Sequence, residues 1–93
     1  MKFMLSFSWK PDISARDQAI ARFRKSGTLP IEGVTLLGRW TRADFNGGFD
    51  LLESDNPEAL AEFALMWSDL MEVTIVPVLE DRQLSEVLER AGK

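Results

Sequence analysis

The sequence predicts an α+β domain built from a four-stranded antiparallel sheet, two covering helices and a further helix near the carboxyl end. Three observations carry this prediction. Residues 2–9 alternate in polarity with period two, which is typical of a strand half-covered by a core. Residues 34–54 contain Asn46-Gly47, a strong hairpin turn signal between two apolar runs. Residues 56–71 carry apolar side chains at helical spacing.

The first strand is followed by a helix. One side of the strand carries Phe3, Leu5, Phe7 and Trp9, and the other carries Met4, Ser6 and Ser8. Pro11 ends the strand because proline cannot donate to a ladder. Ser14 is expected to cap a helix that Gly27 terminates, with Ala19, Ile20 and Phe23 as its apolar stripe. A loop over residues 28–33 then leads to the hairpin.

The hairpin determines which side chains share a face of the sheet. A loop of two or of four residues gives the same parity, so both place the same residues together. One face then carries Val34, Leu36, Gly38, Trp40, Phe49 and Leu51, and the other carries Thr35, Leu37, Arg39, Thr41, Asp50, Leu52 and Ser54. A bulge at Gly47-Gly48 would flip one strand relative to the other.

The second half of the chain gives clear boundaries. Asn56 is a good N-cap and Pro57 a good first residue for a helix with the stripe Leu60, Phe63, Ala64, Trp67 and Met71. Residues 72–79 form the last strand, and Pro77 within it indicates a sheet edge. Asp81 is expected to cap a final helix, ended by Gly92, with the stripe Leu84, Val87, Leu88 and Ala91.

The order strand, helix, strand, strand, helix, strand is that of the ferredoxin-like split βαβ arrangement. We therefore expect residues 1–93 to form a single ferredoxin-like domain. Its first and third strands should be central, its second and fourth strands should be edges, and both helices should cover one face. The extra helix is expected to dock on its own sheet edge or on a partner chain.

Several segments also carry a family resemblance. They are the opening run at residues 3–11, Arg16-Asp17, residues 36–40, Gly47-Gly48-Phe49, residues 67–70 and Val76-Pro77-Val78. In order and spacing they resemble a family of small bacterial domains of unknown function, itself similar to the dimeric α/β-barrel superfamily. That superfamily includes cofactor-free monooxygenases, isomerases and stress-response proteins. The resemblance implies the fold and a homodimer, and it implies no reaction.

Composition narrows the function classes. The chain has no Cys and no His, which removes thiolate chemistry and the commonest metal ligand and general base. The net charge of -4, with no basic run, disfavours nucleic acid as a partner. No apolar run approaches membrane-spanning length, so we expect a cytoplasmic protein that does not bind membranes. Asp44, Asp50 and Glu53 lack the spacing of a known metal loop. Neither a metal nor a cofactor is expected.

The faces predict where a ligand would bind. The more apolar set is expected under the helices: Phe3, Leu5, Phe7, Val34, Leu36, Phe49, Leu51, Val73 and Ile75. The opposite face then mixes apolar, hydroxyl and charged groups: Met4, Ser6, Ser8, Leu37, Arg39, Asp50, Leu52, Thr74, Val76 and Val78. In a homodimer formed through this sheet face, the mixed surface would meet the partner's sheet and enclose a small-ligand pocket.

Arg39 is the sharpest candidate for ligand binding, because its guanidinium suits a carboxylate or an enolate oxygen. The alternative is a structural pair between Arg39 and Asp50 or a partner carboxylate. Asp50, on the same face, is a further candidate for ligand binding. Ser6 and Ser8 are candidates for hydrogen bonds to a ligand or ordinary polar surface residues, and Trp40 is expected to help wall the site. The favoured function is a homodimeric module that binds a small organic molecule. The alternative is a cofactor-independent monooxygenase or isomerase, with Arg39 stabilising developing negative charge.

Overall fold

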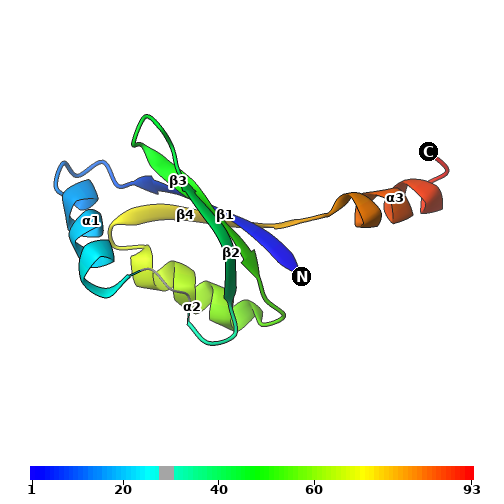
Figure 1. The fold of residues 1–93 in the computed structure, drawn as a ribbon, viewed down its shortest axis with the longest axis horizontal. Helices are drawn as coiled ribbons and strands as arrows, with labels where there is room; N and C mark the ends of the chain where they lie inside the picture. Colours follow the sequence, from blue (N-terminus) through cyan, green and yellow to red (C-terminus); the bar gives the residue numbers. More distant parts are fainter. Residues whose placement is uncertain (28–30) are drawn as a thin grey trace.

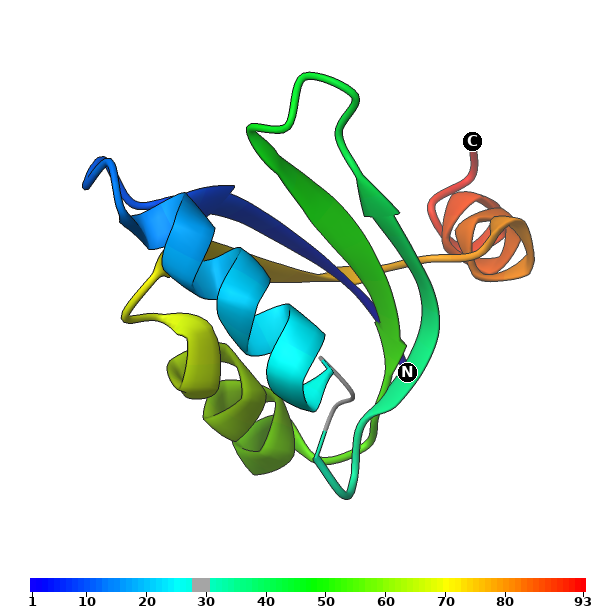
Figure 2. The ribbon, with the colours of Figure 1, turned by 60° about the vertical axis from the view of Figure 1, so that its left-hand side comes forward.

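The computed structural model describes residues 1–27 and 31–93, so residues 28–30 of the expected loop lie outside the described residues. Its elements follow the predicted order (Figure 1): β1 (Lys2–Trp9), α1 (Ala15–Ser26), β2 (Thr35–Thr41), β3 (Gly47–Glu53), α2 (Pro57–Trp67), β4 (Met71–Val78) and α3 (Asp81–Arg90). The four strands form one antiparallel sheet in the order β2-β3-β1-β4. Figure 2 shows α1 and α2 side by side on one face of this sheet. The ferredoxin-like α+β fold is confirmed.

The positions of the strands in the sheet are also as expected. β1 and β3 are central, and β2 and β4 form the edges. Pro77 lies in β4, opposite Phe3 of β1. A proline is tolerated there because an edge strand leaves one row of its backbone groups without a ladder partner. The edge prediction made from Pro77 is therefore confirmed.

The predicted cap of α2 is confirmed, whereas the predicted side-chain cap of α1 is wrong. The Asn56 side chain accepts a hydrogen bond from the backbone N–H of Ala59 at 3.2 Å, and Pro57 is the first helical residue. Before α1, the Ser14 side chain makes no capping bond. Instead, one carboxylate oxygen of Asp12 accepts hydrogen bonds from both the N–H and the hydroxyl of Ser14, each at 2.9 Å. The turn at Asp12 therefore starts the helix.

The register of the central strands decides which side chains lie under the helices. Leu5 of β1 lies opposite Asp50 of β3, and Phe3 lies opposite Leu52. Leu5, Asp50 and Leu52 are all buried, whereas Phe49 is 41% exposed. Asp50 and Leu52 therefore face the helices, and Phe49 and Leu51 face the other way. The predicted assignment of β3 to the two faces is wrong, since it followed apolarity alone.

From Gly38 to Thr41 the predicted parity of the hairpin is confirmed, with the two faces exchanged. Before Gly38 the predicted parity is wrong, because Leu36 lies opposite Leu52 and shares its face. Arg39 lies opposite Asp50, and Trp40 lies opposite Phe49. Arg39 thus faces the helices and Trp40 the open face, by which we mean the sheet face turned away from α1 and α2. The register shifts between Leu36 and Gly38, and this bulge lets Leu36 and Arg39 face the helices together. The bulge considered at Gly47-Gly48 does not occur, because both glycines pair with β1 in continuous register.

The glycine pair has a different role. β2 ends at Thr41 and β3 begins at Gly47, so the loop is longer than a two-residue turn. A Cβ atom on Gly48 would lie 2.3 Å from the carbonyl oxygen of Trp40 and 2.6 Å from the ring of Phe7. Gly48 therefore lets β3 pass closely between β2 and the Phe7 ring.

α3 stands away from the rest of the molecule (Figures 1 and 2). It contains no buried residue. Lys2 hydrogen-bonds and pairs with Glu80, which caps the helix through a reciprocal box with Gln83. The radius of gyration is 15.4 Å, compared with about 12 Å for a compact chain of this length. The protruding helix accounts for this extended shape.

Candidate functional site

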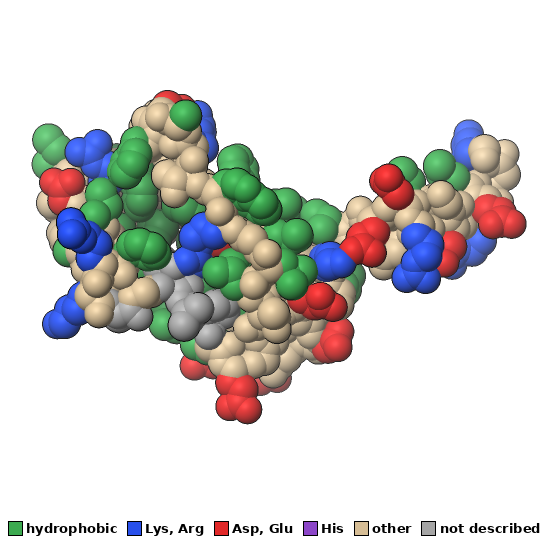
Figure 3. Space-filling view, in the orientation of Figure 1, with side chains coloured by type: hydrophobic (Ala, Val, Ile, Leu, Met, Phe, Trp, Pro, Cys, Tyr) green, Lys and Arg blue, Asp and Glu red, His purple; other side chains and the backbone are tan. Residues whose placement is uncertain are grey.

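A cavity of about 340 Å³ lies between the helix-covered face of the sheet and helices α1 and α2. Figure 3 shows hydrophobic side chains gathered around a hollow on this side of the molecule. Most of the lining is apolar or aromatic, and its main contributors are Phe7, Trp9, Phe23, Phe63, Trp67 and Val73. The core residues beneath it come from every layer, because Leu5 of the sheet packs with Ala19 of α1 and Phe63 of α2. The cavity is thus an opening into the hydrophobic core.

Arg39 and Asp50 place an ion pair in the wall of this cavity. Arg39 Nε donates to Asp50 Oδ1 at 2.7 Å, and Arg39 Nη2 donates to Asp50 Oδ2 at 3.0 Å. The Asp50 side chain is 4% exposed and that of Arg39 is 23% exposed. Two parallel charge-assisted bonds are the strongest geometry for such a pair and offset much of the cost of burial. The pair itself therefore carries no net charge, and Arg24 of α1 is a further charged residue in the lining.

The hairpin loop supplies the mouth of the cavity through Phe45. Phe45 has φ 63°, a left-handed conformation that is costly for a bulky side chain. Its carbonyl oxygen accepts a hydrogen bond from Trp9 Nε1 at 2.6 Å. The Trp9 ring also packs edge-on against Phe7 at 5.9 Å between centroids. The loop tip is thereby tied to the aromatic wall of the site.

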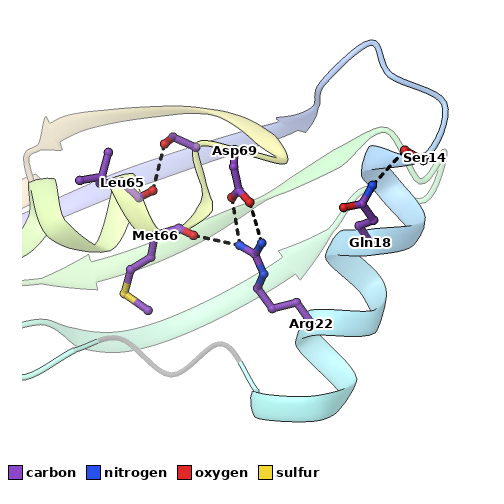
Figure 4. Close-up of polar contacts among 7 residues, drawn as sticks. Ser14, Gln18, Arg22, Leu65, Met66 and Asp69 are labelled. Carbon is purple, nitrogen blue, oxygen red and sulfur yellow. Dashed lines mark hydrogen bonds and ion pairs between the residues drawn. The ribbon is translucent and has the colours of Figure 1, made fainter.

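Arg22 holds the helix wall together (Figure 4). From α1 it donates to the two carboxylate oxygens of Asp69 at 3.0 and 2.7 Å, and to the backbone carbonyl of Met66 at 2.9 Å. Its guanidinium also lies 5.1 Å from the centre of the Trp67 ring. The hydrogen bonds from Arg22 lower the pKa of Asp69, and those to Asp69 raise the pKa of Arg22. This clamp fixes α1 against the end of α2, next to the cavity residue Trp67.

The residues predicted for the site separate into two groups. Arg39 and Asp50 come together in the cavity, in the pairing that the sequence left open as an alternative. Ser6, Ser8 and Trp40 lie on the open face, on the other side of the sheet. Ser6 and Ser8 border a shallow hollow of about 230 Å³ there, together with Arg42, Phe49, Glu72 and Thr74. The five candidates do not form one site.

The sequence reasoning missed the aromatic lining of the cavity. The sequence predicts Phe7, Phe23, Phe63 and Trp67 as ordinary core residues and assigns no role to Phe45. A signal was present, because six Phe and three Trp in 93 residues are many for a small core. Aromatic rings that cannot all interdigitate leave space between them, and the concentration of rings is the clue that could have indicated a cavity.

The structure also bears on metal binding and on membrane-spanning helices. Within residues 1–27 and 31–93, no three acidic side chains gather in a way that could hold a metal ion. In the same part of the chain, no helix has the length and apolar character needed to cross a membrane.

The four-stranded sheet with two helices on one face and a cavity between them defines a small ferredoxin-like α+β domain. Within that class, the chain belongs to the family described as domain of unknown function DUF3303, which matches residues 1–92. The family resemblance found in the sequence is therefore confirmed. No curated protein matches the chain.

Among solved structures, the chain is similar to Rv0793 from Mycobacterium tuberculosis, with 17% sequence identity and a TM-score of 0.40. The match covers 86% of this chain and 95% of that one.

Proposed function

We propose that the protein is a homodimeric module that binds a small, largely apolar molecule in the cavity between its sheet and its helices. The cavity itself carries this proposal. Its volume of about 340 Å³ falls at the lower end of the range of small-molecule sites, about 300–1,000 Å³. An apolar lining with a few polar groups at one position is also the usual composition of such sites.

The ion pair narrows the chemistry of the ligand. Because Asp50 already balances the charge of Arg39 through two hydrogen bonds, an anionic ligand gains little from this arginine. A carboxylate offers about four acceptor positions, so Asp50 suits a neutral ligand that donates a hydrogen bond. We therefore propose an uncharged aromatic or aliphatic ligand with one hydroxyl group, or an aromatic amine, which stays neutral at pH 7. This differs from the anionic ligand that Arg39 alone suggested.

The homodimer is proposed from the open face. Trp40, Phe49 and Val76 are exposed there, on a sheet surface that the protein's own helices α1 and α2 do not cover. Exposed apolar patches of this kind mark interaction surfaces in soluble proteins. A second copy of the chain that covers this face is the partner we propose, and native mass spectrometry at micromolar concentration measures it directly.

Binding is better supported than the cofactor-independent enzyme. A monooxygenase or isomerase of that kind needs a group that takes a proton or stabilises negative charge on the substrate. Arg39 and Asp50 are the charged groups deepest in the cavity wall, and each already satisfies the other. Their arrangement suits a fixed polar contact more than a proton transfer.

The binding proposal can be tested with N-phenyl-1-naphthylamine, a neutral aromatic amine whose fluorescence rises in apolar surroundings. The wild-type protein is expected to bind it, and Ala64→Phe, which fills the cavity from α2, is expected to weaken binding at least tenfold. Ala61→Phe makes the same change on the exposed side of α2 and is expected to leave binding unchanged. Failure of the wild type to bind the probe, or equal losses in both variants, would overturn the proposal. Circular dichroism checks that both variants are folded.

A further inference from the structure

α3 presents an apolar stripe that no described part of its own chain buries. Leu84, Val87 and Leu88 are each more than two-fifths exposed, and the helix contains no buried residue. Figure 1 shows it standing clear of both the sheet and the other helices. An isolated helix of about ten residues is only marginally stable in water, because helices shorter than about 12–15 residues depend on packing. α3 therefore requires a surface to pack against.

A second unpartnered apolar surface lies on the open face. Trp40 and Phe49 are neighbours across β2 and β3, and the bulge exposes Leu37 beside them. The next row across the sheet is Leu51 of β3, Met4 of β1 and Val76 of β4. We call these six residues the open-face patch: Met4, Leu37, Trp40, Phe49, Leu51 and Val76. The patch crosses all four strands and is large enough to cover a helix.

We propose that α3 of one copy packs its apolar stripe on the open-face patch of a second copy, and that the second copy reciprocates. This inference rests on the proposed homodimer and names the surface that each α3 covers. The pair between Lys2 and Glu80 ties the start of α3 to the beginning of β1, and the helix extends away from the sheet of its own chain (Figure 1). With a two-fold axis, each chain contributes its α3 stripe and its open-face patch to the same interface. Two identical contacts then form, and neither apolar surface stays exposed.

The area needed for a stable dimer supports the exchange. Strands of seven residues in a four-stranded sheet give a flat face of about 23 by 19 Å, or roughly 440 Å². A stable interface takes about 800 Å² of accessible surface from each partner. A ten-residue helix about 15 Å long and 10 Å wide adds roughly 150 Å² of footprint. The sheet face alone is small for a dimer, whereas the face together with α3 approaches the required area once the relief of its side chains is included.

Cysteine crosslinking tests the exchange cleanly, because the chain has no Cys of its own. Phe49→Cys places a thiol on the open-face patch of a ¹⁵N-labelled chain, and Val87→Cys places one on the α3 stripe of an unlabelled chain. The two chains are refolded together and joined with a short thiol crosslinker. Because each chain has one thiol, a mixed-mass crosslink must join two copies. We expect this product to form at least five times more than with Glu86→Cys, which lies on the opposite side of α3.

The outcomes separate this inference from the proposed dimer. A wild-type protein that is monomeric at micromolar concentration overturns both. A dimer that shows no preference for Val87→Cys over Glu86→Cys overturns the exchange and leaves the sheet-face dimer standing. A double variant Phe49→Cys/Val87→Cys that crosslinks within one chain at high dilution also overturns it, because α3 then covers its own sheet. Trp40→Cys replaces Phe49→Cys if the latter does not fold.

Discussion

Arg39 and Asp50 join the two strands of the hairpin on the helix-covered face, with guanidinium and carboxylate in register one pair beyond the bulge in β2. This pair explains how a carboxylate whose side chain is 4% exposed lies opposite Leu5 in the core. Without the bulge, Leu36 and Arg39 would point to opposite faces, since side chains alternate along a strand. The bulge therefore lets β2 contribute both a core leucine and the partner of Asp50.

Removing one member of the pair is expected to cost more than removing both. Asp50→Asn leaves Arg39 partly buried without its counter-charge, and loss of one partner of a buried pair costs about 3–5 kcal/mol. The double variant Arg39→Met/Asp50→Leu replaces both charges by apolar groups and is expected to lie within about 1 kcal/mol of the wild type. Urea unfolding of the wild type, Arg39→Met, Asp50→Leu and the double variant measures this coupling, with Asp50→Asn alongside. Equal stability of Asp50→Asn and wild type would show that the pair is not buried in solution.

The two hairpin glycines are expected to respond differently to alanine. A Cβ on Gly48 meets the backbone oxygen of Trp40 at 2.3 Å, and backbone cannot move without breaking the ladder. A Cβ on Gly38 meets the outer ring atoms of Trp40, the nearest at 2.6 Å, and this exposed ring can swing away. Gly48→Ala is therefore expected to destabilise by about 2–4 kcal/mol and Gly38→Ala by less than about 1.5 kcal/mol. Thermal unfolding of both variants ranks them, and the reverse order would contradict this geometry.

The fold was predictable because its signals are local. Alternation in β1, the caps at Asn56 and Pro57, and Pro77 at an edge each depend on a few neighbouring residues. Hairpin parity was predictable for the residues next to the loop, where it depends on the length of the loop, and was not predictable beyond the bulge between Leu36 and Gly38. These signals fixed the order of elements and placed β1 and β3 in the centre of the sheet.

The apolar pattern did not predict which side chains of the hairpin lie under the helices. Counting apolar residues places Phe49 under the helices and Asp50 on the opposite face of the sheet, whereas the structure does the reverse. The contact between Arg39 and Asp50 depends on a bulge between Leu36 and Gly38. Gly38 is the sequence signal for this bulge, because an isolated glycine within a strand pattern suggests one, but the prediction considered a bulge only at Gly47-Gly48. The same reversal moved Arg39 and Asp50 away from Ser6, Ser8 and Trp40. It also moved the candidate site from the open face to the cavity.

Stability is expected to depend on pH through the Arg22 clamp. The bond from Arg22 holds the pKa of Asp69 below its ordinary value of 3.8, so the carboxylate is charged in the folded state at a pH where the unfolded state begins to protonate. The contribution is complete above about pH 5 and disappears as the pH falls through the lowered pKa. Asp69→Asn is therefore expected to cost about 0.5–1 kcal/mol at pH 7 and almost nothing at pH 2.5. Glu62→Gln on α2 is the control, and an Asp69→Asn effect that persists at pH 2.5 contradicts the mechanism.

Replacing Phe45 is expected to lower ligand affinity without lowering the melting temperature. Its left-handed φ of 63° strains a bulky residue, and such strain persists where the side chain has a function. Phe45→Gly relieves the strain and keeps the carbonyl that accepts the Trp9 hydrogen bond, so the melting temperature should stay within about 2 °C of wild type or rise. The same change removes the ring from the mouth of the cavity. Affinity for N-phenyl-1-naphthylamine is therefore expected to fall at least fivefold.

Ala43→Gly, in the same loop but not in the cavity lining, is the control and should leave affinity unchanged. If Phe45→Gly loses stability while keeping its affinity, the ring is a packing element of the hairpin and the mouth of the site lies elsewhere.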